Sequence, residues 1–175
     1  MRVLWCIVLL ALTAPLAPAQ AGKALTMPEN KAFLDLCFSP DASKIAVRQG
    51  AEKLEDDIVR VYSLPGLKLL GAVGRCVHAR GTKFSPDGAF LAVIEYHDKQ
   101  DKICVYDVTE SPPRLVNRLV FKNRTGAYRP WPRQMMFSPD GKHLFATQEV
   151  GEKSLLHGWE FATSDRKSTR LNSSH

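Results

Sequence analysis

Hydrophobic residues in this 175-residue chain fall into short runs that are separated by polar turns. Three of the turns share one tetrapeptide, because residues 38–41, 84–87 and 137–140 all read Phe-Ser-Pro-Asp, and glycine follows the second and third copies. Proline sets the first corner of a type I turn, while serine and aspartate bond to nearby backbone groups. Apolar residues flank each turn, so each copy predicts a strand, a tight turn and a second strand.

The repeat extends beyond this hairpin. The predicted second strands are 44–47, 90–94 and 143–147, the third strands are 58–62, 103–107 and 155–160, and a fourth strand follows in the first two copies at 67–70 and 115–121. Four strands per unit, at spacings of 46 and 53 residues, are typical of β-propeller blades. We therefore expect an all-β fold, a partial β-propeller of about three four-stranded antiparallel blades near residues 30–74, 75–122 and 130–163.

The third strands end in an aromatic residue, which is followed by an acid in Tyr106-Asp107 and Trp159-Glu160, whereas Tyr62 has only the aromatic. With its FSPDG turns and these pairs, the chain resembles the WD40-repeat-like β-propellers over roughly residues 30–163. TolB-like and YVTN-like propellers share the turn and are close alternatives. The resemblance implies a ring of blades, of which this sequence holds an N-terminal fragment.

The first 21 residues have the pattern of a secretory signal peptide. Arg2 is followed by an apolar run over residues 3–12, and small residues then offer a cleavage site. The run is shorter than the ~20 residues of a membrane-spanning helix, although an uncleaved anchor is the alternative. We expect an exported protein, periplasmic or secreted, whose propeller part occupies residues 22–164.

The last eleven residues, 165–175, break the repeat pattern. They back-translate codon by codon into a common sequencing adapter, so we interpret them as a disordered artefact and expect the natural protein to continue past Ser164; a natural polar tail is the alternative. Repeat units bury their faces against neighbours, and three blades leave both flanks open. The fragment is therefore expected to self-associate through its open strand edges.

Charge and cysteine content narrow the possible partners. Residues 22–164 hold 20 Lys and Arg against 17 Asp and Glu, and these charges are interspersed along the chain. This net positive charge is too small to indicate that the protein binds nucleic acid. Three cysteines remain in this part, Cys37, Cys76 and Cys104. Buried free thiols are favoured because Cys37 and Cys104 lie in apolar strands. In an exported protein, one disulfide between two of the three cysteines is the alternative, and the sequence does not choose the pair.

The connection between the second and third blades, residues 123–133, is the main candidate for binding. It combines arginines with Tyr and Trp, the residue types that dominate binding hot spots, and such connections emerge at a propeller face. Alternatively, its two aromatic residues fill space between blades. The candidate binding residues are Arg124, Tyr128, Arg129, Trp131 and Arg133.

Motifs for catalysis are missing from the sequence. It contains no Gly-x-Ser-x-Gly elbow, His-Glu-x-x-His pair, phosphate loop or dinucleotide fingerprint. The acidic stretch 52–57 and its counterpart 97–102 are expected to be solvated loops, residues 71–74 a turn, and the strand histidines satisfied by neighbours. We therefore predict no catalytic residue, cofactor or metal site.

The favoured hypothesis is an exported propeller that binds a protein or small ligand without catalysis. The alternatives are the propeller of a serine hydrolase of the prolyl-oligopeptidase type, whose catalytic domain would lie outside this sequence, and a TolB-like periplasmic component. Fold alone does not decide among them.

Overall fold

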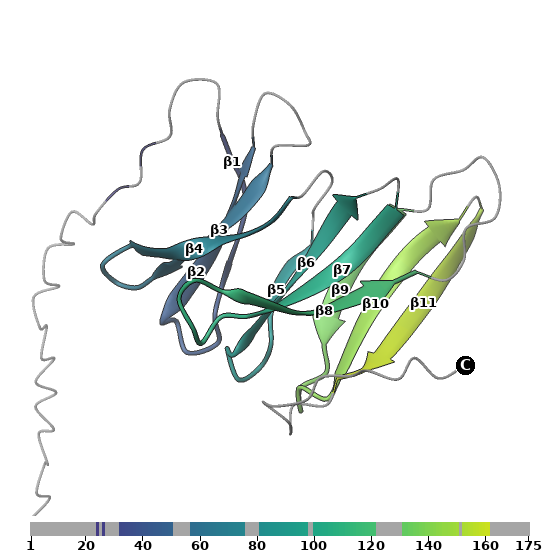
Figure 1. Cartoon of the computed structure of the whole chain (residues 1–175). Coiled ribbons are helices and arrows are strands. Elements are labelled where there is room, and N and C mark those ends of the chain that lie inside the picture. Colours follow the sequence, from purple (N-terminus) through teal and green to yellow (C-terminus); the bar gives the residue numbers. More distant parts are fainter. Residues whose placement is uncertain are drawn as a thin grey trace, which may run out of the picture.

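The fold was obtained as a computed structural model, which describes residues 24, 26, 32–50, 57–75, 81–97, 100–121, 131–150 and 152–161. These residues form three antiparallel sheets that lie side by side (Figure 1). The strands are β1 (Ala32–Phe38), β2 (Lys44–Gly50), β3 (Ile58–Ser63) and β4 (Lys68–Arg75); β5 (Thr82–Phe84), β6 (Phe90–His97), β7 (Gln100–Asp107) and β8 (Arg114–Val120); β9 (Trp131–Phe137), β10 (His143–Val150) and β11 (Lys153–Glu160). The predicted all-β partial propeller is confirmed, with a third blade of three described strands. No helix that could span a membrane occurs in the described ranges.

Each Phe-Ser-Pro-Asp turn is closed by the same hydrogen bonds. In blade two, the Ser85 hydroxyl donates to Asp87 Oδ1 at 2.5 Å and accepts from the Phe90 amide at 2.9 Å, while Asp87 Oδ1 also accepts from the Ala89 amide at 3.0 Å. The corresponding bonds of Ser39 and Ser138 have nearly the same lengths. These repeated side chains therefore build the turns, as the sequence predicts.

The turn of blade one carries Ala42 where the other two blades carry Gly88 and Gly141. All three have positive φ angles, 55°, 68° and 70°. A residue with a Cβ that adopts a positive φ loses ~1–2 kcal/mol of folding free energy relative to glycine. Part of this difference is offset, because glycine has more freedom to lose from the unfolded chain. We expect Ala42→Gly to raise the free energy of unfolding by up to about 1 kcal/mol, as measured by urea denaturation. Ala72→Gly, in the exposed part of β4, is the control and should lower it.

The blades pack through alternating faces of their strands. On β6, Leu91 and Val93 point to blade one, whereas Ala92 and Ile94 point to blade three. The cluster between blades one and two contains Ala46, Val59, Val61, Val73, Leu91, Val93, Cys104, Tyr106 and Val108; the cluster between blades two and three contains Ala92, Ile94, Ile103, Val105, Leu119, Phe121, Met135, Leu144, Ala146 and Phe161. The first strands, β1, β5 and β9, lie next to one another across the blade boundaries, so we call them the inner strands.

Three sequence-based expectations are wrong. Residues 71–74 lie in β4 and form no turn, and irregular pairing with β3 accommodates them. Gly74 has a φ of 63°, and a Cβ added there would lie 2.7 Å from Glu95 Oε1. Asp57 is fully buried, although the acidic stretch was expected to be solvated. Residues 97 and 100–102 belong to the paired strands β6 and β7, because the hairpin turn is shorter than predicted.

Candidate functional site

The predicted binding connection lies almost entirely outside the described residues. Arg124, Tyr128 and Arg129 fall outside them. Trp131 and Arg133 belong to the inner strand β9, but their side chains are not among those described. The five residues therefore remain a prediction.

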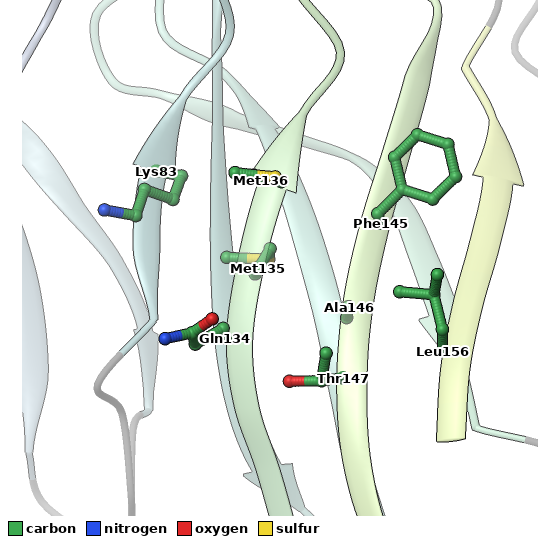
Figure 2. Close-up of a pocket in the computed structure, with 8 residues that line it drawn as sticks. All are labelled: Lys83, Gln134, Met135, Met136, Phe145, Ala146, Thr147 and Leu156. Atoms are coloured by element: carbon green, nitrogen blue, oxygen red, sulfur yellow. The ribbon is translucent and has the colours of Figure 1, made fainter. Parts of the chain in front are cut away.

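A pocket of about 600 Å³ lies along blade three, and its lining extends to Lys83 of blade two (Figure 2). Its apolar wall consists of Met136, Phe145 and Leu156, which we call the open flank of blade three. The lining comes from four strands, β5, β9, β10 and β11: Lys83, Gln134, Met135, Met136, Phe145, Ala146, Thr147 and Leu156. Met135 is buried and Met136 is exposed.

The exposed polar side chains of this pocket lie on the inner strands. Lys83 on β5 and Gln134 on β9 are both exposed, and Figure 2 shows the lysine amine and the glutamine amide pointing to the same side, away from β10 and β11. An ammonium group donates hydrogen bonds and carries positive charge, whereas a side-chain amide both donates and accepts. Together they suit a ligand with a carboxylate or phosphate group and neighbouring hydroxyl groups.

A polar side chain recurs eleven residues after each turn phenylalanine, at Gln49, Glu95 and Gln148. Each is bonded to the third strand of its blade. Gln49 Nε2 donates to the Tyr62 hydroxyl at 3.2 Å, the Tyr106 hydroxyl donates to Glu95 Oε1, and Gln148 Oε1 lies 2.8 Å from His157 Nε2. These residues were missed by the sequence analysis, although the repeated spacing would have revealed them, and they hold neighbouring strands together.

His157 is enclosed by aromatic side chains. Its ring stacks on Trp159 with centroids 5.7 Å apart, and Phe121 meets it edge-on at 5.1 Å. Burial lowers the pKa of His157, so the neutral ring is favoured at neutral pH. Because Gln148 Oε1 can only accept, His157 Nε2 donates in this pair. The expectation that this strand histidine is satisfied by a neighbour is confirmed.

Both described cysteines are free thiols that do not act as nucleophiles at neutral pH. Burial, aided by nearby Asp35, raises the pKa of Cys37 to about 12, and burial aided by Glu95 raises the pKa of Cys104 to about 12. The thiolate is the reactive form of cysteine, so these two residues pack as small apolar side chains. Cys76, the third candidate for a disulfide, lies outside the described residues.

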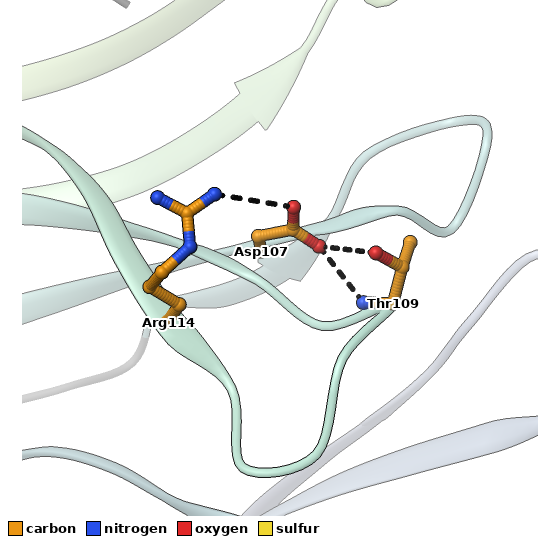
Figure 3. A network of polar contacts seen from close by, with 3 residues as sticks. All are labelled: Asp107, Thr109 and Arg114. Atoms are coloured by element: carbon orange, nitrogen blue, oxygen red, sulfur yellow. Dashed lines mark hydrogen bonds and ion pairs between the residues drawn. The ribbon is translucent and has the colours of Figure 1, made fainter. Parts of the chain in front are cut away.

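The acid of the Tyr106-Asp107 pair shapes a turn. Asp107 Oδ1 accepts from the Thr109 amide at 2.9 Å and from its hydroxyl at 2.6 Å, and Arg114 Nη2 lies 3.9 Å from Asp107 Oδ2 (Figure 3). Arg114 is exposed, so this ion pair is weak. The described ranges contain no group of three His, Cys, Asp or Glu side chains that could hold a metal ion.

Comparison with known proteins decides the family. Residues 71–167, more than half of the chain, match the family described as Lactonase, 7-bladed beta-propeller. The chain belongs to this family. A search of curated proteins found no match.

Solved structures agree with this fold. The chain is similar to a prolyl endopeptidase with a TM-score of 0.59 and 13% identity, and the match covers 86% of this chain and 22% of that one. It is also similar to a putative 6-phosphogluconolactonase from Bacteroides uniformis with a TM-score of 0.52 and 18% identity, and the match covers 82% of this chain and 45% of that one. A third similar structure is TolB from Acinetobacter baumannii, with a TM-score of 0.52 and 19% identity, where the match covers 77% of this chain and 31% of that one. At these identities the likeness shows the fold alone, which confirms the expected resemblance to β-propellers. The chain spans less than half the length of each of these relatives.

Proposed function

We propose that the chain is part of an exported propeller that binds a protein or small ligand without catalysis. One observation carries this proposal: the buried and half-buried groups of catalytic type are bonded to or packed against neighbouring strands, whereas the exposed polar groups of the pocket lie on the inner strands. Glu95, Cys104 and His157 are the carboxylate, thiol and imidazole concerned, and each contacts neighbouring strands. Lys83 and Gln134 instead present their polar ends along the inner strands.

The ligand class follows from these two groups. A cation beside an amide favours an anionic ligand with hydroxyl groups, such as a sugar acid, because hydrogen bonds to charged groups are the stronger ones. The connection that holds Arg124, Tyr128 and Arg129 leads into β9, which carries Gln134, so we include it in the same binding surface. Arginine and aromatic residues there would add further contacts to an anion.

Titration calorimetry with D-gluconate tests the proposed ligand class. Binding by the wild-type chain is expected, and Lys83→Met should weaken it about tenfold or more, since a hydrogen bond to a charged group contributes ~1.5–3 kcal/mol. Lys142→Met, which removes an exposed lysine from the turn of blade three, is the matched control and should leave the affinity unchanged. Equal affinities for the Lys83 variant and the wild type would contradict the assignment of Lys83.

A second candidate function is lactone hydrolysis, which the family match and the likeness to a putative 6-phosphogluconolactonase favour. Its test is the hydrolysis of glucono-1,5-lactone by the same preparation, followed at constant pH. The scaffold proposal predicts no rate above the spontaneous one. A rate that is proportional to protein concentration would replace it with the enzymatic function.

Export is proposed from the pattern of residues 1–21. Fused to an alkaline phosphatase that lacks its own signal, residues 1–30 should give phosphatase activity, because that enzyme is active only after export. Charged residues interrupt an apolar signal core, so replacing both Leu9 and Leu10 with arginine should remove most of the activity. A fusion that begins at residue 22 is the negative control, and activity equal to it from residues 1–30 would contradict export.

A further inference from the structure

A carboxylate lies on the inner strand of blade one, next to the strand that carries Lys83. Asp35 on β1 stands three residues before the turn phenylalanine, and the same repeat position holds Gly81 in blade two and Gln134 in blade three. The inner strands adjoin in the order β1, β5 and β9. Asp35 and Gln134 therefore lie on the two strands that flank β5.

The side chain of Asp35 points to blade two. Cys37, two residues along the same strand, packs against the cluster between blades one and two, and side chains two residues apart on a strand lie on the same face. Asp35 is half-buried, and its Oδ1 accepts a hydrogen bond from the Leu36 amide at 2.9 Å. A further blade on the opposite face of β1 would therefore not cover Asp35.

The charges of Asp35 and Lys83 meet at the contact between β1 and β5. Burial raises the pKa of Cys37 to about 12, the negative charge of Asp35 also raises it, and the positive charge of Lys83 opposes this rise. The Lys83 amine points away from β9 (Figure 2), and β1 is the strand on the other side of β5. An anionic and a cationic group thus lie close to the same thiol.

A buried hydroxyl next to Lys83 in the chain lacks a hydrogen-bond partner. Thr82 is 3% exposed, and its Oγ1 makes no hydrogen bond within the part of the chain that the structure describes. Thr82 pairs with Val93 of β6, which belongs to the cluster between blades one and two, so both side chains face this boundary. Because buried hydroxyl groups are normally hydrogen-bonded, the boundary to which Asp35 points has unused hydrogen-bonding capacity.

Given the anionic, hydroxylated ligand of the proposed function, we propose that Asp35 is a specificity-determining residue, whose carboxylate accepts a hydrogen bond from a ligand hydroxyl group. Lys83 binds the acid group of the ligand, and Asp35 binds a hydroxyl group on the neighbouring carbon chain. Hydrogen bonds to a carboxylate are strong, and a site that bonds a hydroxyl group discriminates against an analogue that lacks it. The site therefore selects polyhydroxy acids over plain carboxylic acids.

Titration calorimetry of the full chain with two six-carbon acids, D-gluconate and hexanoate, tests this role, because hexanoate lacks hydroxyl groups. Asp35→Ala should weaken the binding of D-gluconate about tenfold or more and should leave the weaker binding of hexanoate unchanged. Asp35→Asn keeps an acceptor oxygen and should lose less affinity for D-gluconate than Asp35→Ala. Glu110→Ala, which removes an exposed carboxylate from the turn after β7, is the matched control and should bind both acids like the wild type.

The contradicting results separate the role of Asp35 from the proposed function. A wild type that does not bind D-gluconate would overturn both. If Lys83→Met loses affinity for D-gluconate and Asp35→Ala does not, the ligand class stands and Asp35 is excluded. Equal losses for the two acids in Asp35→Ala would also exclude Asp35, because it would then only support the structure of the site. Circular dichroism checks that each variant is folded, and Asp35→Val, which suits a strand, replaces Asp35→Ala if that chain is unfolded.

Discussion

Replacing Asp57 with alanine is expected to lower the free energy of unfolding by about 3–5 kcal/mol. Asp57 Oδ2 lies 2.5 Å from Arg48 Nη2, and the two side chains are 1% and 11% exposed. Removing one partner of a buried ion pair leaves the other charge in a poorly solvated position, which is strongly destabilising. The loss is a large part of the ~5–15 kcal/mol that stabilises a typical domain.

Urea denaturation followed by circular dichroism measures this loss. Arg114→Ala is the matched control, because it breaks the exposed ion pair with Asp107, which joins atoms 3.9 Å apart. That variant should lose at most about 1 kcal/mol. Similar losses for the two variants would mean that Asp57 is solvated, as the acidic stretch of the sequence suggested.

Leu91→Ala is expected to lower the free energy of unfolding by about 2–5 kcal/mol. Leu91 is completely buried between blades one and two, where it packs among Val59, Val61 and Cys104. Shortening a leucine in such a core removes apolar contacts and leaves a cavity, and both effects destabilise the fold.

The same denaturation assay checks this prediction. Leu69→Ala, at a 49% exposed leucine on β4, is the control and should change the free energy of unfolding by less than about 1 kcal/mol. If Leu91→Ala behaved like this control, blades one and two would not pack against each other through β6.

The strands and turns could be predicted from the sequence because they depend on local chemistry. Pro40 and its counterparts set the turns, and the apolar runs beside them form the strands. The strand at residues 71–74 could not be predicted, because two glycines in four residues resemble a turn, and only pairing with β3 shows that these residues continue β4.

Buried polar residues were harder to predict. Asp57 belongs to an acidic stretch, and its burial depends on Arg48, which only the β2–β3 hairpin brings close. The pocket was also out of reach, because Lys83, Gln134 and Leu156 lie on different strands and only the stacking of blades brings them together. For the binding connection, residues 123–133, the sequence remains the sole basis of the prediction.

Hydrogen exchange measured by mass spectrometry tests the stacked three-blade arrangement most directly. Blade two is covered on both faces, so amides of β6 and β7 should exchange most slowly, and those of β1 and β11, at the two ends, should exchange faster. Slowest exchange in β6 and β7 is the result that stacked blades predict. Equal exchange in all three blades would contradict the stacking.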